Sequence, residues 1–100
     1  MRHLRKDYDR IQDPGLADPS LLAPGCSPIA EDEPVFLLRA KDGASVAAVL
    51  AWAEEAERLG ADKNMTTAAR TWAAVMLKWQ SEHVGCLGKV PDTPADQLKL

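Results

Sequence analysis

Two stretches of the chain carry apolar residues at the three- and four-residue spacing of an amphipathic helix. The first spacing predicts a helix over residues 44–59. We expect Asp42 or Ser45 to cap its start, where free backbone N–H groups need an acceptor. Gly60 is expected to end it in the left-handed conformation. The apolar face comprises Val46, Val49, Leu50, Ala53 and Ala56.

The second spacing predicts a helix over residues 66–84. Asn64 or Thr66 would cap it, with Asp62 as an earlier alternative, and Gly85 would end it. Its predicted apolar stripe comprises Met65, Ala69, Trp72, Met76, Trp79 and His83. Because the link between the two helices is short, we expect an antiparallel two-helix hairpin.

Around the hairpin the sequence predicts three further parts. Residues 1–34 hold five prolines, which favour an extended proline-rich arm. Residues 35–40, in which Arg39 is the one polar residue, predict a short strand, or alternatively a short helix with Pro34 in its first turn. Residues 35–85 would then make the strand and hairpin core, and residues 86–100 a C-terminal tail. The fold class is α+β, mainly α.

The predicted strand and helices both leave surfaces that need partners. A strand cannot leave its N–H and C=O groups unpaired, so its partner is the arm, residues 86–90, or a second copy of the chain. Alanine-rich helices with three tryptophans also leave apolar surface uncovered. Both features favour a homo-oligomer, a dimer or higher.

The composition argues against several kinds of binding partner and cellular location. A net charge of −3 argues against duplex nucleic acid as a partner. No apolar run approaches the ~20 residues that span a membrane, and the N-terminus does not have the pattern of a secretory signal. The two cysteines, Cys26 and Cys86, have no metal-site spacing with a histidine. We therefore expect a cytoplasmic protein with free thiols, no metal and no cofactor.

The sequence contains no recognisable catalytic motif. His3 and His83 lie near opposite ends of the chain, and no serine or cysteine has a base beside it in a recognisable motif. His83 would sit in the last turn of a helix, where the helix dipole favours a cation. The acidic run at residues 31–33 has no acidic counterpart elsewhere and is expected to be solvated. The sequence predicts that the protein is not an enzyme.

The best candidate for a binding site is the junction at residues 39–43, between the predicted strand and the first helix. Arg39 and Lys41 alternate onto one face if the strand continues, and the N-terminus of a helix attracts anions. The alternative is that Arg39 pairs with a carboxylate of residues 31–33. Trp72 and Trp79, seven residues apart, would pack in a core or interface, or stack on a base.

Two segments of the chain resemble small proteins of phages and prophages. They are Arg10-Ile11-Gln12-Asp13-Pro14 and the twelve-residue string Glu-Asp-Glu-Pro-Val-Phe-Leu-Leu-Arg-Ala-Lys-Asp at residues 31–42. The similar proteins also carry an aromatic residue in the following helix, as Trp52 here, and a tail like residues 89–92. The chain departs from them in residues 15–30, which form a longer spacer.

The resemblance implies a phage-type counter-defence protein that binds without catalysis. It would sequester an anionic, nucleotide-like small molecule in a pocket between subunits. Arg39, Lys41 and Arg10 would meet phosphates, Asp42 would complete the junction, and a tryptophan such as Trp52 would meet a base. The alternative is an inhibitor that binds a host protein, of the anti-CRISPR type, or a phage accessory or assembly protein. The nucleotide-binding protein and its alternatives would all act in the cytoplasm of a bacterial host.

Overall fold

The computed structural model describes residues 1–83, 90–91 and 93–99. Contacts divide the chain into two compact units, which we call the terminal unit, Met1–Leu37 with Thr93–Leu100, and the helical unit, Leu38–Asp92. The boundary between them lies inside the segment 35–40 that the sequence assigned to one strand. The expected helix end at Gly85, the second cysteine Cys86, and residues 89 and 92 of the tail segment 89–92 lie outside the described residues.

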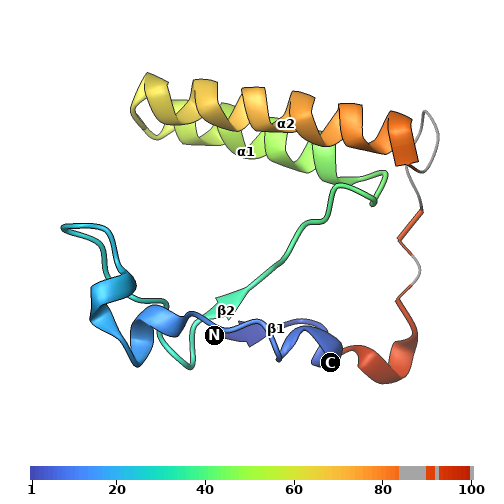
Figure 1. The fold of residues 1–100 in the computed structure, drawn as a ribbon. Helices are drawn as coiled ribbons and strands as arrows, with labels where there is room; N and C mark the ends of the chain where they lie inside the picture. Colours follow the sequence, from blue (N-terminus) through green and yellow to red (C-terminus); the bar gives the residue numbers. More distant parts are fainter. Residues whose placement is uncertain (84–89, 92, 100) are drawn as a thin grey trace. The chain divides into compact units, whose positions relative to one another are not determined.

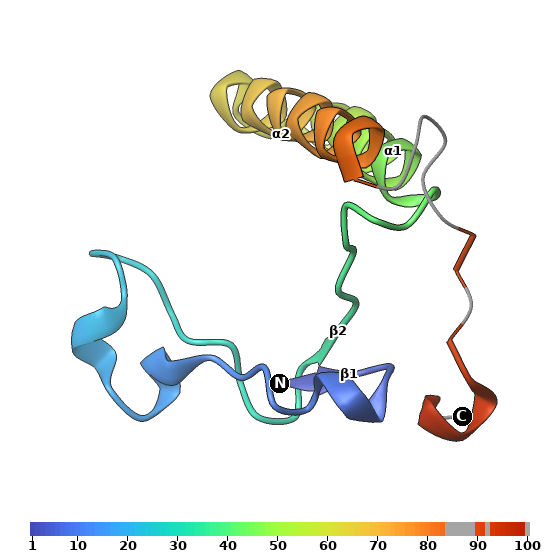
Figure 2. The same ribbon diagram turned by 45° about the vertical axis from the view of Figure 1, so that its right-hand side comes forward.

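The helical unit consists of α1, Ser45–Arg58, and α2, Lys63–His83, which lie side by side along their length (Figures 1 and 2). The sequence predicted both helices, and α2 begins three residues earlier than expected. The prediction of a mainly helical chain is confirmed. In the part of the chain that the structure describes, neither helix has the length and apolar content needed to cross a membrane.

Hydrogen bonds at the helix ends explain where each helix begins and stops. Gly60 has a φ of +89°, and its N–H donates to Glu57 while that of Ala61 donates to Ala56, so the predicted glycine stop is confirmed. The predicted cap of α1 is wrong. Its N-cap is Ala44, which makes no side-chain hydrogen bond. The hydroxyl of Ser45 instead donates to the backbone carbonyl of Asp42.

Asp62 begins α2, which was the earlier of the alternatives for this end. Its carboxylate accepts the N–H of Asn64 at 2.7 Å, and its backbone carbonyl accepts the N–H of Met65 at 3.1 Å. These two bonds satisfy donors that the first turn of a helix leaves free. The helix therefore starts as soon as the four-residue link from α1 allows.

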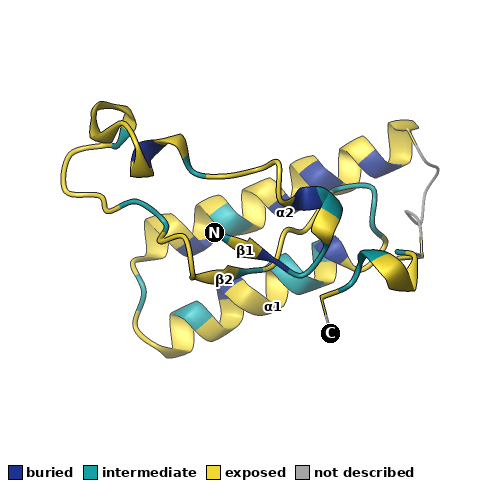
Figure 3. Cartoon of the chain, turned by 90° about the horizontal axis from the view of Figure 1, so that it is seen from below, coloured by how far each residue is buried: buried dark blue, intermediate teal, exposed yellow. Residues whose placement is uncertain are grey.

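Small and polar side chains form the buried layer of the helical unit. Ala53 of α1 and Ala73 and Met76 of α2 are its buried apolar residues. The buried polar residues of this unit are Ser45, Thr66 and Gln80. Most of the remaining surface of both helices is exposed (Figure 3). The buried face of α2 shares Met76 with the predicted stripe, whereas Met65, Trp72 and Trp79 of that stripe remain exposed, because the short side chains of the adjacent row allow a closer approach of α1.

The terminal unit holds a two-stranded parallel sheet, formed by β1, Arg2–His3, and β2, Pro34–Val35 (Figure 1). Arg2 pairs with Pro34, and His3 with Val35. The predicted strand over 35–40 is therefore correct only at Val35. Residues 36–39 have no regular structure, and a turn follows in which the N–H of Asp42 donates to Arg39. Because the arm supplies β1, the strand needs no second copy of the chain as its partner.

Three 3-10 helices shape the proline-rich arm: η1 (Lys6–Tyr8), η2 (Pro14–Leu16) and η3 (Pro19–Leu21). The carboxylate of Asp13 accepts the N–H of Gly15 at 2.8 Å and that of Ile29 at 2.9 Å. These bonds close the loop between the two residues and give the aspartate of the Asp13-Pro14 motif a structural role. The chain returns to this unit at η4 (Ala95–Gln97), after which Leu98 bridges Arg5.

Candidate functional site

A groove in the helical unit, of about 370 Å³, is the largest cavity that we describe. Its walls come from α1, from α2 and from the segment that precedes α1. A volume of this size lies within the range of pockets that bind small molecules. We call it the tryptophan groove. Its lining residues are Leu38, Ala40, Val49, Trp72, Val75, Met76 and Trp79.

Two neighbouring rows of residues on α2 explain why the tryptophans line a groove rather than a core. Thr66, Ala73 and Gln80 are seven residues apart and buried. Each residue of the second row precedes one of these by a single position, which turns it by about 100° around the helix axis. This second row is therefore directed away from α1. Its residues remain exposed by 56% at Met65, 63% at Trp72 and 39% at Trp79.

The ring of Trp79 is held in place by His83, four residues later on α2. The two rings stack with centroids 4.2 Å apart and an angle of 10° between their planes. Nδ1 of His83 lies 2.9 Å from the backbone carbonyl of Trp79, so that this nitrogen carries the hydrogen and donates. The histidine lies in the last turn of α2, where the sequence placed it, and there it satisfies a carbonyl and fixes one side of the groove.

Arg39, Lys41 and Asp42, three of the predicted site residues, share one hydrogen-bonded turn. The backbone carbonyl of Asp42 accepts three hydrogen bonds, from the N–H and hydroxyl of Ser45 and from the side-chain amide of Gln80. The turn is therefore anchored to the start of α1 and to α2. Asp42 acts here through its backbone, whereas the sequence analysis had considered its side chain.

The two cations of this turn alternate in sequence with residues of the groove wall. Leu38 and Ala40 line the tryptophan groove, and Arg39 and Lys41 follow each of them. Arg39 is exposed and Lys41 is half-buried. The structure thus brings both cations to the segment that borders the groove, close to the start of α1.

The two remaining predicted residues occupy other places. Trp52 lies on α1 and is 53% exposed, but it is not among the lining residues of the tryptophan groove. Arg10 belongs to the terminal unit, where its guanidinium donates to the backbone carbonyl of Asp7. The structure therefore places Arg10 in a different unit from the other four.

Sequence reasoning missed Leu38, Ala40 and Val75 as members of a site. Leu38 and Ala40 occupy alternate positions of the apolar run, which is the signal that they share one face. Val75 lies three residues from Trp72 and four from Trp79, which places it between them on the helix surface. The seven-residue spacing of Trp72 and Trp79 already places them on one face of the helix. Val75 lies on the same face and belongs to the wall that α2 gives to the groove.

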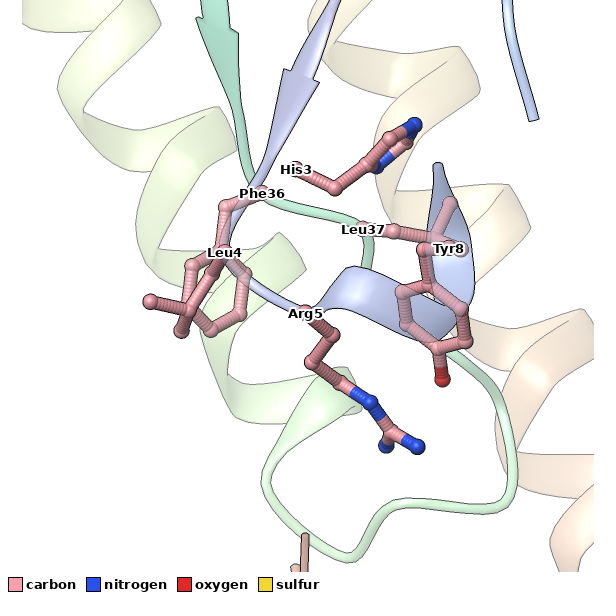
Figure 4. Close-up of a pocket in the computed structure, with 6 residues that line it drawn as sticks. All are labelled: His3, Leu4, Arg5, Tyr8, Phe36 and Leu37. Carbon is pink, nitrogen blue, oxygen red and sulfur yellow. The ribbon is translucent and has the colours of Figure 1, made fainter. Parts of the chain in front are cut away.

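The terminal unit contains a much smaller cavity beside Arg5 and Tyr8, of about 30 Å³, which is the space of roughly one water molecule. The guanidinium of Arg5 lies 4.4 Å from the centre of the Tyr8 ring (Figure 4). The same group donates twice to the carboxylate of Asp7, and this pairing lowers the pKa of Asp7. Arg5 is therefore already engaged on both sides.

Carboxylates with a lowered pKa are weak general bases, and several in this chain are of that kind. Backbone N–H donation from Ile29, and then from Gly15, lowers the pKa of Asp13. Pairing with Arg70 lowers the pKa of Glu57, and this ion pair joins α1 to α2. These groups serve the structure rather than proton transfer.

Metal chemistry has no visible basis within residues 1–83, 90–91 and 93–99, where no three metal-binding side chains converge. Comparison with protein-family models, curated proteins and solved structures gives no match for this chain. Its function is therefore argued from its own residues.

Proposed function

We propose that the chain is a non-enzymatic binding protein whose tryptophan groove takes the ring of an anionic, nucleotide-like small molecule. The observation that carries the proposal is the exposure of Trp72 and Trp79 in a groove of about 370 Å³. Exposed indole rings offer flat surfaces on which any nucleobase stacks, at about 1–3 kcal/mol per base. A purely structural role would favour burial of these rings instead.

The phosphates of such a ligand would meet Arg39 and Lys41. Both residues belong to the turn that follows the groove wall, and the carbonyl of Asp42 anchors this turn to α1 and α2. The N–H of Ser45 already donates to the carbonyl of Asp42, but no side chain caps the start of α1, so its positive dipole end still favours an anion. Arg10 and Trp52 would add a further cation and ring from a second copy of the chain.

We also propose that copies of the chain associate and that a second copy closes the open side of the groove. The exposed row of Met65, Trp72 and Trp79 supports this, because several large apolar side chains side by side are seldom left exposed to water. The proposal treats α1 and α2 as an antiparallel hairpin. It is supported by the contact of Gln80, late in α2, with Ser45, the first residue of α1.

The biological role that we propose is counter-defence in the cytoplasm of a bacterial host. A protein that binds a signalling nucleotide without converting it lowers the free concentration of that signal. The proposal draws on the resemblance of residues 31–42 to phage and prophage proteins, together with the binding surface described above. Sequestration of this kind needs affinity and abundance but no catalytic step.

Thermal unfolding in the presence of nucleotides tests the proposal. A ligand at about 100 times its Kd stabilises the folded state by about 2.7 kcal/mol, which for a chain of this size raises Tm by roughly 10 °C. We expect at least one member of a panel of mono-, di- and cyclic dinucleotides to do so. The shift should disappear in Trp72→Ala and in Arg39→Gln, and should persist in Leu21→Ala, a change in the terminal unit. A panel without any shift contradicts the proposal.

A second candidate function is inhibition of a host protein by direct binding. It is favoured by large apolar residues exposed at other places on the helical unit, such as Leu50 and Leu59 of the α1 region. Affinity capture from host lysate separates the two candidates. A single stoichiometric protein partner, lost in Leu50→Asp and kept in Arg39→Gln, would favour the inhibitor over the nucleotide binder.

A further inference from the structure

The side chains that line the tryptophan groove limit how a bound ring can be recognised. Five of the seven are aliphatic or thioether side chains, and the other two are the indoles of Trp72 and Trp79. Among the described residues that line it, none carries a carboxylate, amide or hydroxyl group. The polar groups of these side chains are therefore two indole N–H donors and the weakly accepting sulfur of the buried Met76.

Strong recognition of one particular base depends on hydrogen bonds to the edge of its ring. A site that makes such bonds rejects the wrong base, because its own buried polar groups then lose their partners. A wall whose side chains carry no oxygen acceptor provides little of this discrimination. The exocyclic groups that distinguish adenine from guanine thus stay in contact with water, and their difference changes the affinity little.

Trp79 offers a ligand one face of its indole ring. The other face is covered by His83, with the ring centroids 4.2 Å apart and the planes within 10° of parallel. Nδ1 of His83 donates to the backbone carbonyl of Trp79 at 2.9 Å, so the histidine is itself fixed. An indole held in this way is ordered before a ligand arrives, and less of the binding energy is lost. His83 is therefore a positioning residue for Trp79.

The stacking of a ligand on the open face of Trp79 increases with the area of the two rings in contact. The two fused rings of a purine cover more of an indole than the single ring of a pyrimidine does. An anionic ligand also suits the charges beside the groove, because Arg39 and Lys41 follow the lining residues Leu38 and Ala40. Ring size and phosphate charge are thus the two properties that this surface can select.

We propose that the tryptophan groove selects purine nucleotides by ring size, without distinguishing adenine from guanine, and that the purine stacks on the face of Trp79 that His83 leaves open. This inference rests on the binding function proposed above and narrows its ligand to one chemical class. A pyrimidine nucleotide makes less contact with the same surface, and a sugar phosphate without a base makes no stack at all.

NMR titrations of the full chain with AMP, GMP, CMP and UMP test the inference through the indole N–H signals of Trp72 and Trp79. At equal ionic strength, the dissociation constants of AMP and GMP should lie within about threefold of each other. CMP and UMP should bind about five- to tenfold more weakly, because their rings cover less of the indole. Ribose phosphate, which has the anion without the base, should give no saturable shift of the Trp79 signal.

Two substitutions of His83 test its positioning role. His83→Ala frees the indole of Trp79, so it should lower the affinity for AMP several-fold and reduce the preference for purines over pyrimidines. His83→Phe keeps an aromatic ring on Trp79 and should restore most of both. Leu21→Ala, a change in the terminal unit, is the control and should bind as the unchanged chain does. Dispersed amide signals show that each variant is folded.

Each outcome of these titrations decides one claim. Purines that bind alike and more tightly than pyrimidines, with rescue in His83→Phe, support the inference. Saturable binding in which AMP and GMP differ by more than the stated range, or in which pyrimidines or ribose phosphate bind as tightly as purines, overturns the inference but leaves a binding function in place. No saturable shift with any of the four nucleotides overturns both. An unchanged preference for purines in His83→Ala overturns the role of His83.

Discussion

The side-chain amide of Gln80 donates to the backbone carbonyl of Asp42 across 3.0 Å, and so ties α2 to the turn that precedes α1. The two residues are 38 positions apart in the sequence. The same amide lies 3.4 Å from the hydroxyl of Ser45, the first residue of α1. The position of Arg39 and Lys41 beside the tryptophan groove therefore depends on Gln80. This buried residue lies neither in the turn nor among the lining residues of the groove.

We predict that Gln80→Ala destabilises the helical unit by about 1–3 kcal/mol, because the change removes the hydrogen bonds of the buried Gln80 amide to the Asp42 carbonyl and the Ser45 hydroxyl. Urea unfolding followed by helical circular dichroism measures the loss. Gln12→Ala is the matched control, since Gln12 is exposed and donates only to the nearby carbonyl of Asp9. Equal stabilities of the two variants would show that the Gln80 bond does not hold the turn.

If copies of the chain associate as proposed, Trp72→Glu should convert the proposed oligomer to a monomer and leave the fold nearly unchanged. The ring is 63% exposed within one copy, so its replacement should alter monomer stability by no more than about 0.5 kcal/mol. A charge on the row that meets a second copy should prevent association. Light scattering coupled to size-exclusion chromatography gives the mass. If the unchanged chain is a monomer at micromolar concentration, the proposed association is wrong.

Gly60→Ala should cost about 1–2 kcal/mol of stability, because the φ of +89° that ends α1 is unfavourable for residues with a Cβ atom. Gly60→Asn should cost less, since asparagine tolerates this conformation. The free space around the Gly60 Cα means that the cost is conformational and not steric. Urea midpoints of the three chains provide the comparison, and identical midpoints would refute the assignment of the turn.

The terminal unit should lose stability in acid through Asp13. Donation from Ile29 and Gly15 lowers the pKa of this carboxyl in the folded state below its ordinary value of 3.8. The contribution is therefore complete above about pH 3.8 and is lost as the pH falls through the folded-state pKa. Asp13→Asn should remove this pH dependence.

Amide hydrogen exchange at Gly15 and Ile29 reports the effect of Asp13 directly. Protection should fall between pH 4 and pH 2 in the unchanged chain, after correction for the intrinsic exchange rate. It should be low at every pH in Asp13→Asn. The control is Asp32→Asn, which removes an exposed carboxylate of the same unit. If Asp13→Asn and Asp32→Asn lose the same amount of protection at Gly15 and Ile29, the special role assigned to Asp13 is wrong.

The helices were predictable from sequence because their periodicity depends only on the spacing of apolar residues. The face by which they meet was not. Bulky residues dominate any hydrophobic pattern and point to the row of Trp72 and Trp79, whereas close packing selected the adjacent row with Ala73. Two rows that differ by one position carry similar periodicity, and only the shape of the partner helix decides between them.

The strand and the turn at residues 39–42 show a different limit. The apolar run from Val35 to Ala40 suits a strand, but the length of a strand is set by its partner, and β1 has only two residues. The turn at Asp42 precedes α1 as predicted, but β2 ends at Val35 and does not run into this turn. Its anchoring by the Asp42 carbonyl and Gln80 required tertiary contacts that no local pattern contains.

Mass spectrometry of the protein purified from phage-infected bacteria with an active nucleotide-based defence tests the tryptophan groove most directly. We predict that the unchanged chain releases a nucleotide-like compound on denaturation, in stoichiometric amount, and that Trp72→Ala and Arg39→Gln release much less. Recovery of no such compound from the unchanged chain, or equal amounts from all three, would contradict the proposed binding function.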